Sequence, residues 1–359
     1  MEPIKYAESK PDLEGIRSSA SREQLRKEKQ ECEGQLEQLY AVLPIAAWTS
    51  LVNDMHDEIV ARAAAVCESE MLEAGCGSPP VPYSFVVFGS LGRRESTLWS
   101  DQDNGLIISD EVHQAKNEYF QAYGHRLSNL LEYLGYGPCK GKVMCSEPLW
   151  RKTLEEWKRQ IASWHQDYGW EPVRYLMIAS DMRFIAGERG LAADWKQFFE
   201  SSMNESPEMA TAILRNTVRH KATLNILGQV VTERFGEHAG EFDVKYGVYI
   251  PLVNSIRYMA LQEGIGETST LKRLEKLTLL DGGNLLLENC QRAFLKALKL
   301  RALASFSMKD GTYSGSGYLP QSELRKKPIS LHLRDCLATA RQLHRALQRR
   351  LRFAERGKS

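Results

Sequence analysis

The stretch from Gly89 to Asp103 holds residue types that could bind phosphate and a divalent cation. Gly89 and Ser90 directly follow an apolar segment, and a glycine there lets the backbone turn tightly and come close to a ligand. Backbone N–H groups of such a turn, together with the Ser90 hydroxyl, can hold a phosphate group. Arg93 and Arg94 add positive charge that pairs well with phosphate oxygens. The stretch therefore begins with a candidate phosphate site.

Eleven residues after Ser90 comes Asp101, and Asp103 follows it after a single intervening residue. On a strand, residues i and i+2 point to the same face, so two such carboxylates repel each other unless a cation lies between them. Hard oxygen ligands of this kind suit Mg²⁺ that is shared with a substrate phosphate. Bound ions can orient an attacking oxygen and stabilise a leaving pyrophosphate. Each feature alone also fits an ordinary turn or a solvated acidic loop, and it is their order along the chain that indicates chemistry.

Two predicted strands must position these residues. Residues 83–88 are an apolar run typical of a buried strand, and residues 104–108 form a second one. A segment rich in Pro and Gly at 77–82 precedes the first strand and is the clearest boundary in the sequence. Before it, apolar residues recur at helical spacing over 21–43 and 46–74. The chain thus leads from a helical N-terminal arm into a strand, the turn, the acidic pair and a second strand.

After the second strand, residues 112–136 and 148–165 have a helical pattern, and 173–179 could be a strand or a helix. From residue 191 onward almost the whole chain has helical periodicity. Further helices are expected at 191–200, 207–235, 252–263, 270–280, 284–306 and 330–355, with a flexible loop at 310–320. The predicted fold class is α+β, with a small mixed sheet and flanking helices, a helical N-terminal arm and an all-α C-terminal domain. We place the arm at 1–79, the sheet domain at 80–190 and the all-α domain at 191–359.

The 359-residue chain has an ordinary globular composition, with 43% hydrophobic and 26% charged residues. Its apolar runs are too short to span a bilayer, and its first residues lack the pattern of a secretory signal. Seven cysteines without a C-x-x-C spacing argue against a disulfide framework or a zinc site. These features predict a cytoplasmic protein with free thiols and no membrane partner.

Positive charge gathers at the C-terminal end. Residues 291–359 hold 16 Lys and Arg against 4 Asp and Glu, whereas the whole chain has a formal net charge of only +1. This end could attract an anionic partner such as a nucleotide, a nucleic acid or an acidic protein face. The alternative is a solvated helix face, which is a common feature, and we expect no nucleic-acid partner.

The order of apolar strand, Gly-Ser turn, arginine, spacer, D-x-D and second strand resembles the signature of the DNA polymerase β nucleotidyltransferase superfamily. The more specific form G-S-x-G-R-x-E, followed by S-D-x-D, is similar to the branch of PII uridylyltransferase and glutamine-synthetase adenylyltransferase. Further stretches resemble a group of signal-transduction nucleotidyltransferases and their C-terminal helical domain. These stretches are Tyr136–Met144 with Trp150, Ser180–Arg183 with Gly187, Phe242–Lys245, Pro251–Val253 with Arg257, and Thr270–Leu274.

The resemblance implies a nucleotide-binding role for the residues of the turn. Gly89, Ser90 and Gly92 would hold a nucleoside triphosphate, and Arg93 would contact its phosphates. Glu95 could brace Arg93 or cap the following turn.

The resemblance also implies a catalytic role for three carboxylates. Asp101 and Asp103 would bind one or two Mg²⁺ ions. Asp181 is the candidate for the third carboxylate of the superfamily, which lies on a neighbouring strand and helps to deprotonate the attacking group. An ion pair with an arginine is the alternative role for Asp181.

The implied reaction moves a nucleoside monophosphate from a nucleoside triphosphate to an acceptor hydroxyl, which the same resemblance suggests to be on a regulatory protein. The alternative is a non-catalytic regulatory protein that binds nucleotide with the same fold. Modification of nucleic-acid ends fits less well, because the C-terminal domain resembles that of the signal-transduction group. The N-terminal arm could pair with a second copy in a homo-oligomer or fold onto its own chain.

Overall fold

The computed structural model describes residues 10–203, 207–218, 232–233, 235–304, 306–309 and 312–356. The chain divides into two compact units, which are described separately below. Unit 1 comprises Met1–Gln160, Asp181–Gln197 and Met308–Ser314, and unit 2 comprises Ile161–Ser180, Phe198–Ser307 and Gly315–Ser359. The boundary placed at residue 79 does not separate compact units, because the N-terminal arm and the first strands belong to the same unit.

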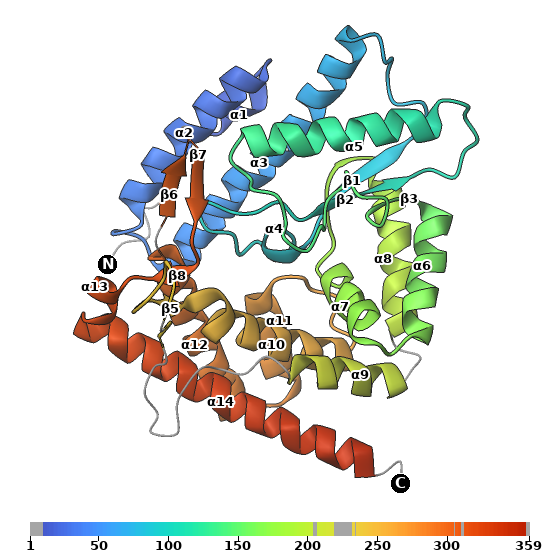
Figure 1. The fold of residues 1–359 in the computed structure, drawn as a ribbon. Coiled ribbons are helices and arrows are strands. Elements are labelled where there is room, and N and C mark those ends of the chain that lie inside the picture. Colours follow the sequence, from blue (N-terminus) through green and yellow to red (C-terminus); the bar gives the residue numbers. More distant parts are fainter. Residues whose placement is uncertain are drawn as a thin grey trace. The chain divides into compact units, whose positions relative to one another are not determined.

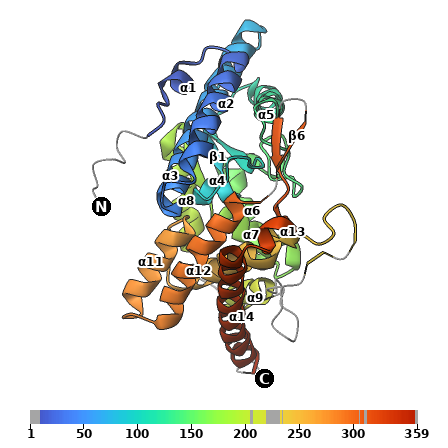
Figure 2. The ribbon, with the colours of Figure 1, turned by 90° about the vertical axis from the view of Figure 1, so that its left-hand side faces the viewer.

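Three helices precede the sheet in unit 1: α1 (Glu14–Ser18), α2 (Arg22–Leu39) and α3 (Ile45–Glu73). The side chain of Ser21 accepts a hydrogen bond from the Gln24 amide, as an N-cap serine does, and this fixes the start of α2. Leu25 and Leu36 are fully buried on one side of α2, and Figures 1 and 2 show α2 lying along α3. Helices predicted over 21–43 and 46–74 are confirmed, the first with a shorter C-terminal end and the second shifted by one residue.

A four-stranded mixed sheet forms the centre of unit 1. Its strands are β1 (Tyr83–Val87), β2 (Asn104–Ile108), β3 (Arg151–Thr153) and β4 (Arg183–Gly187), in the order β3-β2-β1-β4. β1 is antiparallel to both β2 and β4, whereas β2 and β3 are parallel (Figure 1). Every residue of β1 and β2 is buried, which explains why both strands are apolar runs in the sequence.

Four helices connect and follow these strands: α5 (Lys116–Tyr133), α6 (Leu154–Gln166), α7 (Trp170–Ala179) and α8 (Arg189–Met203). The Trp157 indole of α6 donates a 2.9 Å hydrogen bond to the Leu106 carbonyl of β2, so this tryptophan packs within the core. The helix predicted from residue 148 begins later, because β3 occupies the residues before α6. The ambiguous segment 173–179 is helical, and β4 was not predicted because its half-exposed residues carry no clear alternation.

Unit 2 is mainly helical. Its helices are α9 (Pro207–Thr217), the π-helix η3 (Lys245–Tyr249), α10 (Ile250–Gln262), α11 (Thr270–Leu280), α12 (Leu285–Ala302), α13 (Gln321–Leu324) and α14 (Lys327–Arg356). The prediction of an all-α domain was wrong in detail. Unit 2 also holds the short strands β5 (Phe242–Asp243) and β8 (Tyr318–Leu319). The strands β6 (Phe306–Lys309) and β7 (Thr312–Gly315) include residues of Met308–Ser314 and thus of unit 1, so part of the predicted loop 310–320 is extended. Of the predicted helix 207–235, residues 219–231 and 234, including His220, lie outside the described residues.

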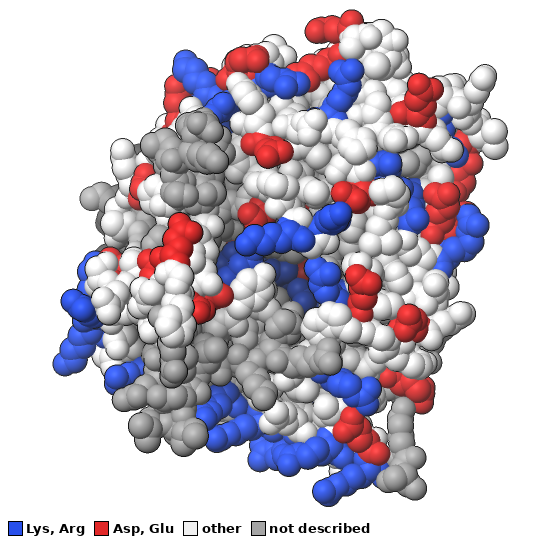
Figure 3. Space-filling view, viewed as in Figure 1, with Lys and Arg blue, Asp and Glu red and all other residues white. Residues whose placement is uncertain are grey.

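Much of the positive charge of the C-terminal end lies on α14. Its buried residues recur at helical spacing and are Ile329, Leu333, Cys336, Leu337, Ala340, Leu343 and Leu347, and the helix packs with α10 and α12. The arginines at 334, 345, 349 and 352 are exposed, and Figure 3 shows basic side chains along the course of this helix. These contacts favour the solvated-face alternative for the positive charge. Among the described residues, no helix combines the length and apolarity needed to cross a bilayer.

Candidate active site

The turn after β1 is a one-turn helix, α4 (Gly89–Arg93), in place of the irregular turn predicted from the sequence. Gly89 has a φ of +55°, a left-handed conformation that favours glycine. A Cβ atom at residue 89 would collide with Oδ2 of Asp103. The Asp103 carboxylate therefore lies directly against the backbone of the turn, and it can do so only because residue 89 has no side chain.

The acidic pair lies in the segment immediately before β2 and not within the strand itself. The Phe88 amide donates a 2.9 Å hydrogen bond to the Asp103 carbonyl, which aligns the segment with the end of β1. The intervening Gln102 is buried, and its side-chain amide donates to the Ser128 carbonyl of α5 at 3.2 Å. Asp101 is exposed. The Asp103 carboxylate lies beside Gly89, whereas Oδ1 of Asp101 lies beside Gly137.

The Ser90 hydroxyl belongs to a short chain of serines. Its Oγ lies 3.2 Å from Oγ of Ser100, and the Ser100 hydroxyl donates to Oγ of Ser96 at 3.4 Å. The Glu95 amide donates to the Ser90 carbonyl at 2.9 Å. These bonds connect the turn to the residue that precedes the acidic pair.

Arg93 and Asp181 are buried together beneath the turn. The Arg93 side chain is only 4% exposed and that of Asp181 is 0% exposed, and Nη1 of Arg93 lies 2.5 Å from Oδ2 of Asp181. Nε of Arg93 donates to Oε2 of Glu95 at 2.9 Å, so Glu95 braces the arginine. Gly92 is buried as well, and a Cβ atom there would collide with the Asp181 carbonyl. The geometry therefore gives Gly92, Arg93 and Asp181 a supporting position, and it favours the ion-pair alternative for Asp181 over an open catalytic carboxylate.

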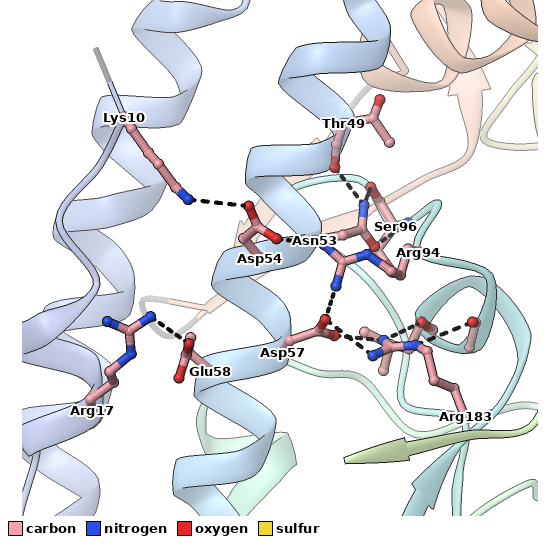
Figure 4. Close-up of polar contacts among 12 residues, drawn as sticks. Lys10, Arg17, Thr49, Asn53, Asp54, Asp57, Glu58, Arg94, Ser96 and Arg183 are labelled. Atoms are coloured by element: carbon pink, nitrogen blue, oxygen red, sulfur yellow. Dashed lines mark hydrogen bonds and ion pairs between the residues drawn. The ribbon is translucent and has the colours of Figure 1, made fainter. Parts of the chain in front are cut away.

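Helix α3 holds the segment that follows the turn through an ionic contact (Figure 4). Arg94 has a φ of +56° and pairs with Asp54 at 2.5 Å and with Asp57. Asp57 also pairs with Arg183 of β4 at 2.6 Å. Burial raises the pKa of Asp57, and the two arginines partly offset this rise by favouring the ionised carboxylate. One carboxylate of α3 thus ties together the end of the turn and the neighbouring strand.

Two further residues of α3 bind the backbone of the same segment. Asn53 accepts a hydrogen bond from the Ser96 amide at 3.1 Å and donates to the Ser96 carbonyl at 3.3 Å. Nε2 of His56 lies 2.8 Å from the Thr97 carbonyl, which can only accept, so Nε2 carries the proton and Nδ1 accepts from the Tyr136 hydroxyl at 2.7 Å. Burial lowers the pKa of His56 to about 3. The histidine is therefore a neutral bridge at physiological pH.

Sequence reasoning did not identify these α3 residues as parts of the site. Asn53 and Asp54 lie three or four positions before His56 and Asp57 in α3, and this spacing places the two polar pairs on one face of the helix. That pattern could have indicated a buried polar contact. It could not have named the partner, because the partner segment lies about forty residues further along the chain.

Cys139 is the other residue that lies against the acidic pair. Its thiol is hydrogen-bonded to the Asp103 side chain, and burial together with this neighbouring carboxylate raises the pKa of the thiol to about 12. Within the described part of the chain, no group of three or more His, Cys, Asp or Glu residues could hold a metal ion. Two carboxylates are nevertheless sufficient for Mg²⁺ that takes its other ligands from water and substrate phosphates.

Comparison with protein families gives two matches. Residues 35–169 match the family described as "Putative nucleotidyltransferase DUF294", and residues 207–351 match "Putative nucleotidyltransferase substrate binding domain", DUF294_C. Together the two matches span most of the chain and indicate a nucleotidyltransferase. No curated protein matches the chain. The first match begins within α2, so it includes the polar face of α3 as well as the turn and the acidic pair.

Substitution of Gly89 by alanine tests the contact with Asp103. We expect Gly89→Ala to lower the free energy of unfolding by about 2–4 kcal/mol, because alanine must adopt a left-handed φ and its methyl group meets a carboxylate. Gly34→Ala is the matched control, since nothing lies near that position on α2 and alanine favours a helix by about 1 kcal/mol. Urea unfolding measures both effects, and equal stability of Gly89→Ala and the wild-type protein contradicts the contact.

Replacement of Asp181 distinguishes a supporting role from a catalytic one. We expect Asp181→Asn to lower the free energy of unfolding by about 3–5 kcal/mol, because it leaves a buried arginine with one carboxylate fewer. Asp194→Asn on the exposed side of α8 is the control and should change stability little. A variant of Asp181 that retains full stability but loses activity would instead support a catalytic carboxylate.

The buried His56 should make stability depend on pH. Since its pKa in the folded chain is about 3, against about 6.5 when unfolded, the unfolded chain binds a proton first as the pH falls. The contribution is complete above about pH 6.5 and is lost progressively toward pH 3, by up to about 1.4 kcal/mol per pH unit. Urea unfolding at several pH values should show a flatter dependence for His56→Gln than for the wild-type protein. The same slope in both proteins refutes this assignment.

Proposed function

We propose that this protein transfers a nucleoside monophosphate from a nucleoside triphosphate to an acceptor hydroxyl and releases pyrophosphate. The observation that supports the proposal best is the contact of the Asp103 carboxylate with the backbone of Gly89, two residues after the exposed Asp101. A glycine-serine turn beside two carboxylates brings a phosphate-binding backbone next to ligands for a divalent cation. Both family matches are consistent with this reaction.

Asp101 and Asp103 would hold one or two Mg²⁺ ions. Carboxylate oxygens are the ligands that Mg²⁺ prefers, and the remaining positions would be filled by water and by the triphosphate. The repulsion between the two carboxylates is relieved when a cation binds. Bound Mg²⁺ would neutralise charge on the triphosphate and lower the pKa of the acceptor hydroxyl.

The protein's own residues would orient the reacting groups. The backbone of Gly89 and the Ser90 hydroxyl would hold the triphosphate, and the polar face of α3 would keep the connecting segment 94–97 in place. The acceptor oxygen would attack the α-phosphorus as the bond to the leaving pyrophosphate breaks. Because Asp181 is buried against Arg93, we assign it to the support of the turn and not to proton transfer.

The acceptor in this proposal is a hydroxyl of a regulatory protein, as the resemblance to PII uridylyltransferase suggests. Unit 2 would present that acceptor, since the DUF294_C match is described as a substrate-binding domain. The pathway would then be signal transduction, in which attachment of a nucleotide changes the activity of the modified protein.

Labelled ATP, GTP, CTP and UTP, each with Mg²⁺ and cell extract, test the reaction. We expect label to appear on a protein acceptor with the wild-type chain and to fall by about a thousandfold or more with Asp101→Asn or Asp103→Asn. Both variants should remain folded, because removing a carboxylate relieves repulsion. EDTA should abolish transfer.

Exposed Asp194 on α8 again provides the matched control, since Asp194→Asn removes one carboxylate elsewhere in unit 1. Retained transfer in the Asp101→Asn/Asp103→Asn double variant refutes the site. Nucleotide binding without transfer to any acceptor supports the non-catalytic alternative.

A further inference from the structure

A loop between α5 and β3 runs along the acidic pair. The Gln102 amide donates to the Gly137 carbonyl at 2.9 Å, and the Asn104 amide donates to the Val143 carbonyl at 3.0 Å. These two bonds attach the two ends of the loop to the backbone on either side of Asp103. The position of residues 137–143 relative to the carboxylates is therefore fixed by the same segment that carries them.

Gly137 at one end of this loop lies beside Asp101, and Cys139 within the loop lies against Asp103. A Cβ atom on Gly137 would lie 3.5 Å from Oδ1 of Asp101, and the Cys139 thiol is hydrogen-bonded to Asp103. The Lys142 amide donates to the Cys139 carbonyl at 2.9 Å and closes a tight turn. The loop thus folds back on itself with Cys139 held against the acidic pair.

Two exposed lysines flank the tip of this turn. Lys140 and Lys142 lie on either side of Gly141, and both side chains are exposed. Among the described residues, the only non-glycine residues with a left-handed φ are Lys142, at +54°, and Arg94, at +56°. Both lie in segments that border the acidic pair, and such unfavourable conformations tend to occur at functional sites. Neither lysine forms an ion pair within the part of the chain that the structure describes.

We propose that Lys140 and Lys142 bind the terminal phosphates of the triphosphate and the pyrophosphate that forms from them. This proposal rests on the function proposed above and names the residues that recognise the leaving group. Both lysines lie in the loop that is hydrogen-bonded to the backbone on either side of Asp103, and lysine provides a mobile point charge suited to phosphate oxygens. Charge grows on the leaving pyrophosphate during transfer, so two nearby cations favour both binding and departure.

Binding of inorganic triphosphate in the presence of Mg²⁺ tests the proposal without requiring turnover. We expect Lys140→Ala/Lys142→Gly to bind triphosphate at least about tenfold more weakly than the wild-type protein in isothermal titration calorimetry. Glycine at position 142 suits the left-handed backbone, so this variant should fold as well as the wild-type chain. Lys140→Arg/Lys142→Arg keeps both charges and should restore most of the affinity.

The control removes two exposed lysines elsewhere in unit 1, as Lys10→Ala/Lys27→Ala, and should bind triphosphate as the wild-type protein does. Binding by Lys140→Ala/Lys142→Gly within twofold of the wild-type protein overturns the assignment of the lysines and leaves the proposed reaction standing. Absence of triphosphate binding to the wild-type protein overturns the proposed reaction itself. The two failures are therefore distinguishable.

Discussion

The contact between the Asp103 carboxylate and the backbone of Gly89 is the constraint on which the candidate site depends. It requires a residue without a side chain at the first position of α4 and a left-handed φ at the same place. It also requires the acidic segment to approach the end of β1, which the bond from the Phe88 amide to the Asp103 carbonyl secures. Sheet, turn and acidic pair are thus joined through one residue that contributes only its backbone.

Around this contact the protein arranges charge in two different ways. Beneath the turn, Arg93 is enclosed by Asp181 and Glu95, so its charge is neutralised within the core. Above the turn, Asp101 is exposed and Asp103 is partly buried against Gly89. The buried ion pairs of Arg93 with Asp181 and Glu95 hold the backbone of the turn in place, because charged partners removed from water cannot easily be replaced by water.

The sequence allowed the motif, the α+β class and the bounds of β2 to be predicted, because each of these depends on local pattern. Apolar runs with turn residues between them identified β1 and β2, and helical periodicity identified α2 and α3. The pairing of Arg93 with Asp181 was beyond that reasoning, since the two residues are 88 positions apart and only the sheet brings them together. The hydrogen bonds of α3 to the segment 94–97 could not be predicted either, because the two segments are about forty residues apart in the sequence. Motif matching could name residues that resemble a site, but it could not distinguish those that face solvent from those that support them.

The hydrogen bonds and ion pairs between α3 and the segment 94–97 determine which truncated fragments of this protein can keep the site folded. The Pro- and Gly-rich connection at 77–82 invites excision of a minimal fragment that starts at Tyr83. Such a fragment would keep every residue of the motif, yet the buried backbone groups of Ser96 and Thr97 would lose their partners, and the apolar side of α5 that packs on α3 would be bared to water. The smallest fragment that keeps the site folded therefore includes α3. The segment 77–82 connects two parts of one unit and is not a domain boundary.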